Sequence, residues 1–298
     1  MSAPALEGIQ VDGARARLFV ALQHLLPQHF LSRLVHQITR SRRPFVRDAL
    51  IKAFVDHFHP DMSDAETPDP LDYETFNAFF TRALRANARP TDPDPAALVS
   101  PVDGTISQIG LLDGSWLVQA KGHDYTLESL LATNLSWPER FRGGAFATLY
   151  LAPFNYHRVH MPLRGRLRAA WYVPGKLFSV NAATAAGVPA LFARNERVVC
   201  MFGDESLSFA LVLVGALFVG SITTVWHGEV TPRALASGTG LPLDESRAPL
   251  ELEKGAEAGR FNMGSTVILL LPPGRSEWLG ALAPGSRVRV GQALARLA

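Results

Sequence analysis

From Leu98 to Ala298 the chain alternates short apolar runs with glycine and proline, and this pattern constrains the fold more than any other feature. The runs are rich in Val, Ile, Leu and Phe, which are the residues that strands prefer. Glycine punctuates them at positions 104, 110, 114, 143, 144, 165, 175, 215, 220 and 228. Such spacing predicts strands joined by tight turns. We therefore expect an α+β protein in which residues 98–298 form a mainly antiparallel β-sandwich or barrel-like core.

The first 60 residues have a different character. Between Arg15 and Phe58 the pattern is helical, with Val46, Leu50, Phe54 and Phe58 at four-residue spacing, and prolines at 27 and 44 divide it into two or three amphipathic helices. Residues 1–60 hold eight Lys and Arg against four Asp and Glu, a local balance of +4. Basic residues beside Leu, Phe and Ile favour a membrane-association region over 1–60. The alternative is an ordinary helical pack with a solvated basic face.

Residues 61–97 connect these two parts. Residues 61–70 are acidic and contain prolines, which is typical of a linker. Residues 73–84 then predict a helix that carries Phe76, Phe79 and Phe80.

The tripeptide Gly264-Ser265-Thr266 suggests a specific chemistry, because a hydroxyl that follows glycine can attack its own backbone. That reaction needs a nucleophile, an unhindered acyl donor and a base. Ser265 and Gly264 supply the first two. Two other segments offer the base and its partner: one carries His157 and His160, and the other carries Asp103. The three segments together indicate a distributed Asp-His-Ser triad.

These residues also allow simpler interpretations. Ser265 could be a plain serine at the start of a strand, but an α/β-hydrolase nucleophile is excluded because Met263 and Val267 replace the flanking glycines. His157 and His160 are three residues apart, and no nearby cluster supplies a third ligand, so no metal is expected. In an extended chain their rings would also face opposite ways.

The net charge, the cysteine content and the N-terminal residues argue against several classes of protein. The net charge of +2 gives no support for nucleic-acid binding. The lone cysteine, Cys200, excludes an internal disulfide, and its neighbours Val199 and Met201 favour a buried thiol. Early acids at Glu7 and Asp12 argue against a secretory signal.

Taken in order along the chain, the motifs resemble those of the phosphatidylserine decarboxylases, the pyruvoyl-dependent bacterial type. Three segments carry the resemblance: Pro-Val-Asp-Gly at 101–104, His-Arg-Val-His-Met-Pro at 157–162 and Met-Gly-Ser-Thr at 263–266. Further similar stretches lie at 120–123, 173–181, 195–198, 214–216 and 254–261. The likeness therefore extends over most of the chain.

The resemblance implies a zymogen that cleaves itself between Gly264 and Ser265, giving a β chain of residues 1–264 and an α chain of residues 265–298. It implies that Ser265 becomes a covalent pyruvoyl group, whose carbonyl forms a Schiff base with the amine of phosphatidylserine, so that carbon dioxide leaves and phosphatidylethanolamine is released. It assigns His160, oriented by Asp103, to self-cleavage. It assigns His157 to protonation of the carbanion.

The resemblance also implies partners and a location. The substrate is a phospholipid, the protein lies on the cytoplasmic side of the cell membrane as a peripheral protein, and two processed protomers form a homodimer. Residues 178–181 (Phe-Ser-Val-Asn) become a candidate pocket wall. Lys121, His123 and Arg158 become candidates for contact with phosphate or carboxylate.

An uncharged stretch at 206–226 is long enough to cross a bilayer. We interpret it instead as two buried strands, because Gly215 and Gly220 break it and β-favouring residues fill it. A single crossing there would also leave His160 and Ser265 on opposite sides of the membrane.

Two other functions stay open from the sequence. One is a Ser-His-Asp hydrolase that uses Ser265 without self-cleavage, and the other is a non-enzymatic membrane-bound β module.

Overall fold

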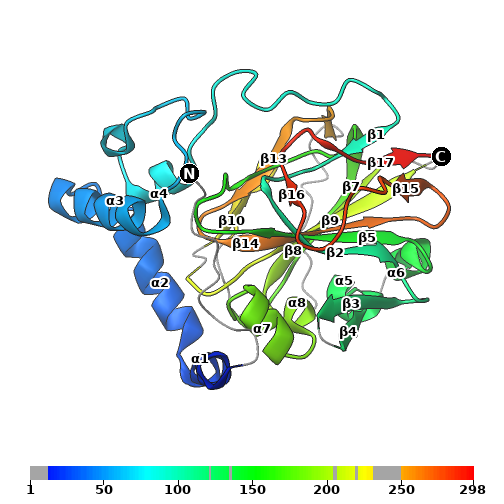
Figure 1. Cartoon of the computed structure of the whole chain (residues 1–298), viewed down its shortest axis with the longest axis horizontal. Helices are drawn as coiled ribbons and strands as arrows, with labels where there is room; N and C mark the ends of the chain where they lie inside the picture. The colour runs from blue at the N-terminus through cyan, green and yellow to red at the C-terminus, as the bar shows by residue number, and fades with distance from the viewer. Residues whose placement is uncertain (1–12, 121, 134–135, 204–206, 219–220, 231–249) are drawn as a thin grey trace.

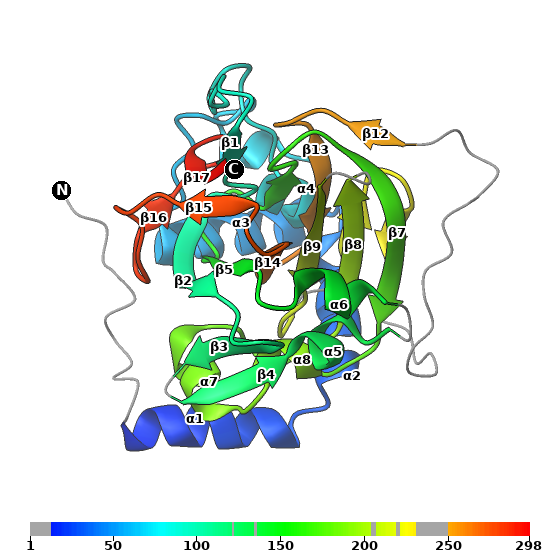
Figure 2. The same ribbon diagram turned by 90° about the vertical axis from the view of Figure 1, so that its right-hand side faces the viewer.

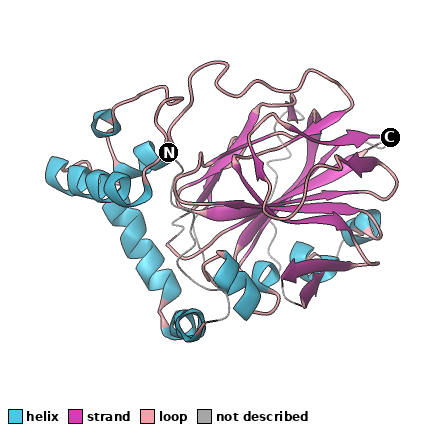
Figure 3. Ribbon diagram, in the orientation of Figure 1, coloured by secondary structure: helices cyan, strands magenta, loops and turns pink. Residues whose placement is uncertain are grey.

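The computed structural model describes residues 13–298 except 121, 134–135, 204–206, 219–220 and 231–249. Helices near the N-terminus form an arm beside a core of strands, as Figure 1 and the colouring of Figure 3 show. Every strand pairing between the named elements is antiparallel. The expected α+β class with a mainly antiparallel core is confirmed, and the described sheets do not close into a barrel.

The largest sheet among the described residues has eight strands in the order β12-β7-β8-β9-β14-β5-β2-β16. Their bounds are Glu251–Leu252 for β12, Gly165–Val173 for β7, Arg197–Gly203 for β8, Ser208–Val214 for β9, Ser265–Leu271 for β14, Ala145–Leu151 for β5, Gly104–Leu111 for β2 and Arg287–Val288 for β16. The inner strands β8, β9 and β14 are buried along their whole length. Their continuous apolar sequences follow from this, because both faces of the sheet are covered.

One face of this sheet packs against smaller sheets. These contain β11 (Gly228–Val230), β10 (Ile222–Thr224), β13 (Glu257–Phe261) and β6 (Arg158–His160) in one, and β1 (Ala97–Val99), β17 (Ala293–Leu297) and β15 (Ser276–Trp278) in the other. Val267 and Leu213 of the large sheet share an apolar cluster with Val159, Phe261 and Leu294 of these strands. The arrangement is a sandwich of unequal sheets.

The opposite face is covered by a hairpin and short helices. These are β3 (Trp116–Ala120), β4 (His123–Thr126), α5 (Leu127–Leu131), α6 (Trp137–Phe141), α7 (Ala182–Gly187) and α8 (Leu191–Arg194). Ile268 and Leu270 of β14 face this side and pack with Leu117, Leu130 and Phe192. The cysteine at 200 lies in β8 and is buried, as its neighbours predicted.

The N-terminal arm consists of α1 (Ala14–Leu25), α2 (Gln28–Thr39) and α3 (Pro44–Phe58), followed by a 3₁₀ turn at Pro70–Asp72 and by α4 (Phe76–Phe80). Pro27 caps the start of α2 and Pro44 opens α3, so both prolines stand where a helix tolerates them. Figure 2 shows α1 along one side of the molecule beside α7, and the two helices are in contact.

The expectation of a helix over 73–84 was too long. The structure has only α4, which begins with Thr75 accepting a hydrogen bond from the Ala78 amide. Beyond Thr81 the chain turns extended, because Leu84 pairs with Ala65 in an antiparallel bridge. A contact with a distant segment replaces the last helical turns.

The uncharged stretch at 206–226 contains the strands β9 and β10, as interpreted from its glycines and β-favouring residues. Residues 206 and 219–220 of this stretch lie outside the described part of the chain. None of the described helices combines the length and the apolar character that crossing a bilayer requires.

Candidate active site around Ser265

Ser265 begins β14, in the middle of the large sheet. It pairs with Leu151 of β5, and the next residue, Thr266, pairs with Val214 of β9. The side chain is fully buried, and its Oγ has no hydrogen-bond partner in the described structure. A buried hydroxyl without a partner costs about 1–3 kcal/mol, so such a group calls for a reason other than stability.

The residue before it is unhindered. A Cβ placed on Gly264 would meet no other atom within 4 Å. An acyl carbon with open space beside it and a free hydroxyl after it are two of the three groups that an attack on the backbone requires, the third being a base.

His157 lies near this strand. Its Nε2 is 3.2 Å from the carbonyl oxygen of Ala152, the residue after the partner of Ser265, and 3.3 Å from that of Pro153. Because a carbonyl only accepts, Nε2 carries the proton and Nδ1 holds a lone pair. That Nδ1 is buried and has no partner among the described residues.

The environment of His157 keeps its ring neutral. The ring is fully buried and stacks on Phe80 with 4.1 Å between ring centroids. Burial, with a smaller contribution from the positive charge of Arg82, lowers the pKa of His157 to about 3. Its Nδ1 is therefore a free base at neutral pH.

His160, at the end of β6, has both ring nitrogens engaged. Its Nδ1 donates to the carbonyl of Gly255 at 2.8 Å, which leaves Nε2 to accept from the Tyr156 hydroxyl at 3.0 Å. Burial lowers the pKa of His160, and the hydrogen bond to Gly255 opposes that shift. The two histidines thus have separate partners.

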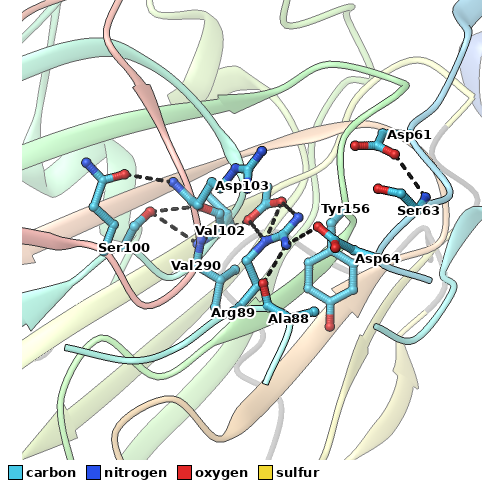
Figure 4. A network of polar contacts seen from close by, with 12 residues as sticks. Asp61, Ser63, Asp64, Ala88, Arg89, Ser100, Val102, Asp103, Tyr156 and Val290 are labelled. Atoms are coloured by element: carbon cyan, nitrogen blue, oxygen red, sulfur yellow. Dashed lines mark hydrogen bonds and ion pairs between the residues drawn. The ribbon is translucent and has the colours of Figure 1, made fainter. Parts of the chain in front are cut away.

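Asp103 is held by an arginine that the sequence reading did not single out. Arg89 contacts both carboxylate oxygens of Asp103, with Nη2 at 2.6 Å from Oδ2, and its Nη1 lies 2.8 Å from Asp64 (Figure 4). The amide of Val290 donates to the same carboxylate at 2.8 Å. Asp103 is thereby fixed and its charge is compensated.

Of the three residues of the predicted triad, Asp103 and His160 lie close to each other. The His160 amide donates to the carbonyl of Pro101 at 2.8 Å, so β6 is tied to the turn that carries Asp103, and the charge of Asp103 acts on the His160 ring. The hydrogen bonds of the structure do not join Asp103, His160 and Ser265 into one chain.

Glu196 is a second residue that the sequence reading missed. Val214 of β9 pairs with Thr266 of β14 on one side and with Arg197 of β8 on the other. One residue further along the sheet, Gly215 therefore lies between Ser265 and Glu196 in a single row across the three chain segments. Residues in one row point to the same face, and glycine has no side chain to separate the other two. The Glu196 side chain covers Gly215, with its Cγ 3.2 Å from where a Cβ would stand.

The carboxyl of Glu196 is nearly inaccessible, at 1% exposure, and accepts a hydrogen bond from the Tyr172 hydroxyl at 3.0 Å. Burial raises its pKa to about 8, so it is mainly protonated at neutral pH. The only signal in the sequence was an acid at the edge of an apolar strand.

Arg82 is the third missed residue. It is 3% exposed, and among the described residues its side chain forms one hydrogen bond, from Nη2 to the carbonyl of Phe154 at 3.2 Å. Its Nε and Nη1 have no partner within the described structure. A buried guanidinium with free donors is costly and adds positive charge beside His157.

The candidate substrate contacts fall in different places. Phe178 is connected to the site through Asn195. The Asn195 side chain accepts a hydrogen bond from the Phe178 amide and donates to the carbonyls of Phe178 and Gly215. His123 begins β4 on the covering hairpin, and Arg158 is paired with Glu257 at 2.8 Å. Lys121 lies outside the described residues. The described residues also contain no group of three His, Cys, Asp or Glu that could hold a metal ion.

Comparison with known proteins gives consistent matches. Residues 76–296 match the family described as phosphatidylserine decarboxylase, and residues 18–59 match one described as PSD. The phosphatidylserine decarboxylase proenzyme of Stutzerimonas stutzeri is 52% identical over 282 residues, which cover 95% of each chain. That of Azotobacter vinelandii is 51% identical over 93% of this chain and 97% of its own. That of Bordetella pertussis is 50% identical over 94% of both.

Proposed function

We propose, from the premise that this chain belongs to the phosphatidylserine decarboxylase family and is a decarboxylase, that it is made as a proenzyme which cuts itself between Gly264 and Ser265. The observation that carries this proposal is the unpartnered, buried Oγ of Ser265 directly after an unhindered glycine. A hydrolase that uses Ser265 without self-cleavage would need access to Ser265 in the uncut chain, where this residue is fully buried. The proposed decarboxylase needs access to this position only after the chain has been cut.

The cleavage can be written with the atoms of this chain. The Oγ of Ser265 attacks the carbonyl carbon of Gly264, the amide nitrogen leaves with a proton, and an ester replaces the peptide bond. Removal of the Ser265 α-proton then expels the Gly264 carboxylate. The new N-terminal residue tautomerises, takes up water and loses ammonia, leaving a pyruvoyl group.

We assign His160 as the base for this reaction. Its Nε2 carries the lone pair that a base requires, and Tyr156 now donates to it. The proton of Ser265 therefore reaches His160 either by transfer through the Tyr156 hydroxyl or directly, after that hydroxyl has moved away from Nε2. Asp103, anchored by Arg89, supplies negative charge that favours the protonated ring.

The residues fit a pyruvoyl group derived from Ser265, since the Oγ of Ser265 is buried without a hydrogen-bond partner among the described residues and Gly264 is bordered by open space. That group supplies a carbonyl that binds the substrate amine and accepts the electrons released when carbon dioxide leaves. His157 is assigned to the proton transfer that follows. Because its pKa is about 3, its Nδ1 must take up a proton before the ring can give one.

We further propose that the N-terminal arm lies on the cytoplasmic face of the membrane, where the phospholipid substrate is reached. Large apolar side chains of the arm are exposed by 39–81%: Leu18, Leu22, Leu25, Leu26, Phe30, Leu34, Ile38 and Phe45. Exposed apolar residues on a basic helical region suit an anionic membrane surface. A homodimer of processed protomers completes the proposal.

Intact mass of the purified protein tests self-cleavage. We expect two fragments, residues 1–264 and 265–298, with the smaller one gaining two hydrogen atoms on borohydride reduction of its carbonyl. Ser265→Ala should leave one full-length, inactive chain. Thr266→Ala is the matched control, because it removes the neighbouring hydroxyl, which is also buried and unpartnered, and should still be cleaved. Active enzyme with an uncut chain would refute the proposal.

A further inference from the structure

A cavity of about 270 Å³ lies where α1 ends and α2 begins. Its lining comes from three parts of the chain: residues 24 and 26–30 of the arm, Lys176 and Phe178 of the segment before α7, and Arg194 at the end of α8. None of these side chains belongs to the group of residues assigned above to cleavage or proton transfer.

The cavity is lined by basic groups. His24, His29, Lys176 and Arg194 all contribute, and none of the lining residues is an Asp or Glu. In the described structure neither Lys176 nor Arg194 forms an ion pair. Two cations that pair with no carboxylate of the described residues, beside the first turn of α2 with its positive dipole end, favour an anion.

The base of the cavity is built from buried hydrogen bonds. Gln28, which is 6% exposed, accepts from the Leu177 amide at 2.8 Å through its Oε1, and Gln23 accepts from the Ser179 amide at 2.7 Å. These two side chains fix Phe178 between them. The Phe178 ring in turn contacts the His24 ring and lies under the Arg194 guanidinium, 4.8 Å and 5.1 Å away. The buried hydrogen bonds therefore hold Phe178 in place, and Phe178 in turn positions His24 and Arg194.

The rim of the cavity is apolar and faces outward. Leu26 and Phe30 line it and are 39% and 59% exposed, and the adjacent Leu25 is 81% exposed. An anion with an attached apolar tail matches this combination better than a free anion does, because the tail would cover the exposed side chains.

We propose that this cavity binds the negatively charged headgroup of a membrane phospholipid, with its phosphate between Lys176 and Arg194 and its acyl chains along Leu26 and Phe30. This inference rests on the membrane association proposed above. It adds a defined headgroup site to that association.

The site is also linked to the reaction centre. Asn195, the residue after Arg194, bonds both Phe178 and Gly215, and Gly215 stands beside Ser265 in the sheet. A headgroup held at the cavity would thus contact the segment that borders the buried serine.

Binding of dihexanoyl phosphatidylglycerol, used as monomers below its critical micelle concentration, tests the proposal by calorimetry on the purified full chain. We expect saturable binding to one site. Lys176→Ala combined with Arg194→Ala should weaken it about 25-fold, as about 5-fold per cation implies. Both side chains are exposed, so the fold should be kept, and equal thermal unfolding of the variant would confirm that.

Arg33→Ala is the matched control, because Arg33 is an exposed cation on α2 outside the cavity and should leave the affinity within 2-fold. Dihexanoyl phosphatidylcholine, which has no net charge, should bind at least 10-fold more weakly than the glycerol lipid. Equal binding by the double variant, or equal binding of the two lipids, would overturn the assignment. Inorganic phosphate that binds as tightly as the lipid would overturn it in favour of a free-phosphate site.

Turnover of phosphatidylserine in detergent separates this inference from the function it rests on. A wild-type chain that fails to release carbon dioxide refutes the proposed function whatever the calorimetry shows. Normal turnover with unchanged binding in the double variant refutes the headgroup site alone.

Discussion

Replacing Glu196 by glutamine should remove a large pH dependence from the stability of the uncut chain. Glu196 is 1% exposed, and burial raises its pKa from 4.5 to about 8. Each pKa unit corresponds to 1.36 kcal/mol, so the difference between the folded and unfolded chains amounts to about 5 kcal/mol at most.

The direction follows from where the proton is held. Between pH 4.5 and about 8 the folded chain keeps the proton of Glu196, whereas the unfolded chain has released it. The free energy of unfolding therefore falls as pH rises through this window and levels off above it. Below pH 4.5 both states are protonated, and the carboxyl makes no difference.

Glu196→Gln keeps a carbonyl oxygen to accept from Tyr172 but does not titrate. Measured by urea unfolding in a Ser265→Ala background, which should prevent the proposed cleavage, the variant should match its parent near pH 4.5. By pH 8 it should be more stable by up to about 5 kcal/mol.

Glu277→Gln serves as the control, since Glu277 is exposed on β15 and should give no such trend. A stability difference between Glu196→Gln and its parent that is the same at pH 5 and pH 8 would refute the reasoning, because it would mean that the buried carboxyl holds no extra proton.

The remaining predictions concern the site and the arm. Asp103→Asn, which breaks the buried ion pair with Arg89, should lower the free energy of unfolding by about 3 kcal/mol, measured by urea unfolding. It should also slow self-cleavage, measured by gel analysis of the purified chain. An unchanged free energy of unfolding and an unchanged cleavage rate would contradict the role of that pair. His157→Ala should still be cleaved but release little carbon dioxide, and normal turnover would remove its assigned role. Leu25→Gln with Phe30→Gln should shift the protein from sedimented anionic vesicles to the supernatant, because both side chains are exposed on the arm; unchanged sedimentation would count against membrane docking there.

Local patterns in the sequence predicted much of the fold. Glycine-punctuated apolar runs predicted the antiparallel strands, and prolines 27 and 44 marked the starts of α2 and α3. The stretch at 206–226 was separable into strands because its glycines and β-favouring residues are local signals. The Gly264–Ser265 pair is also a local signal, because adjacent residues supply both groups of the proposed cleavage, which stays a prediction.

The partners of those groups were decided by the tertiary structure. Asp103 accepts hydrogen bonds from Arg89 and from the amide of Val290, which is 187 positions away in the sequence. Glu196 lies in the same row of the sheet as Ser265 only because β8, β9 and β14 pair in one particular register. Periodicity and turn chemistry act over a few residues, whereas burial and hydrogen bonding depend on which distant segments the fold brings together. For this reason the sequence by itself determined the strands, the helices and the position of the peptide bond proposed to react, and the folded chain alone determined the charge and protonation of the groups around it.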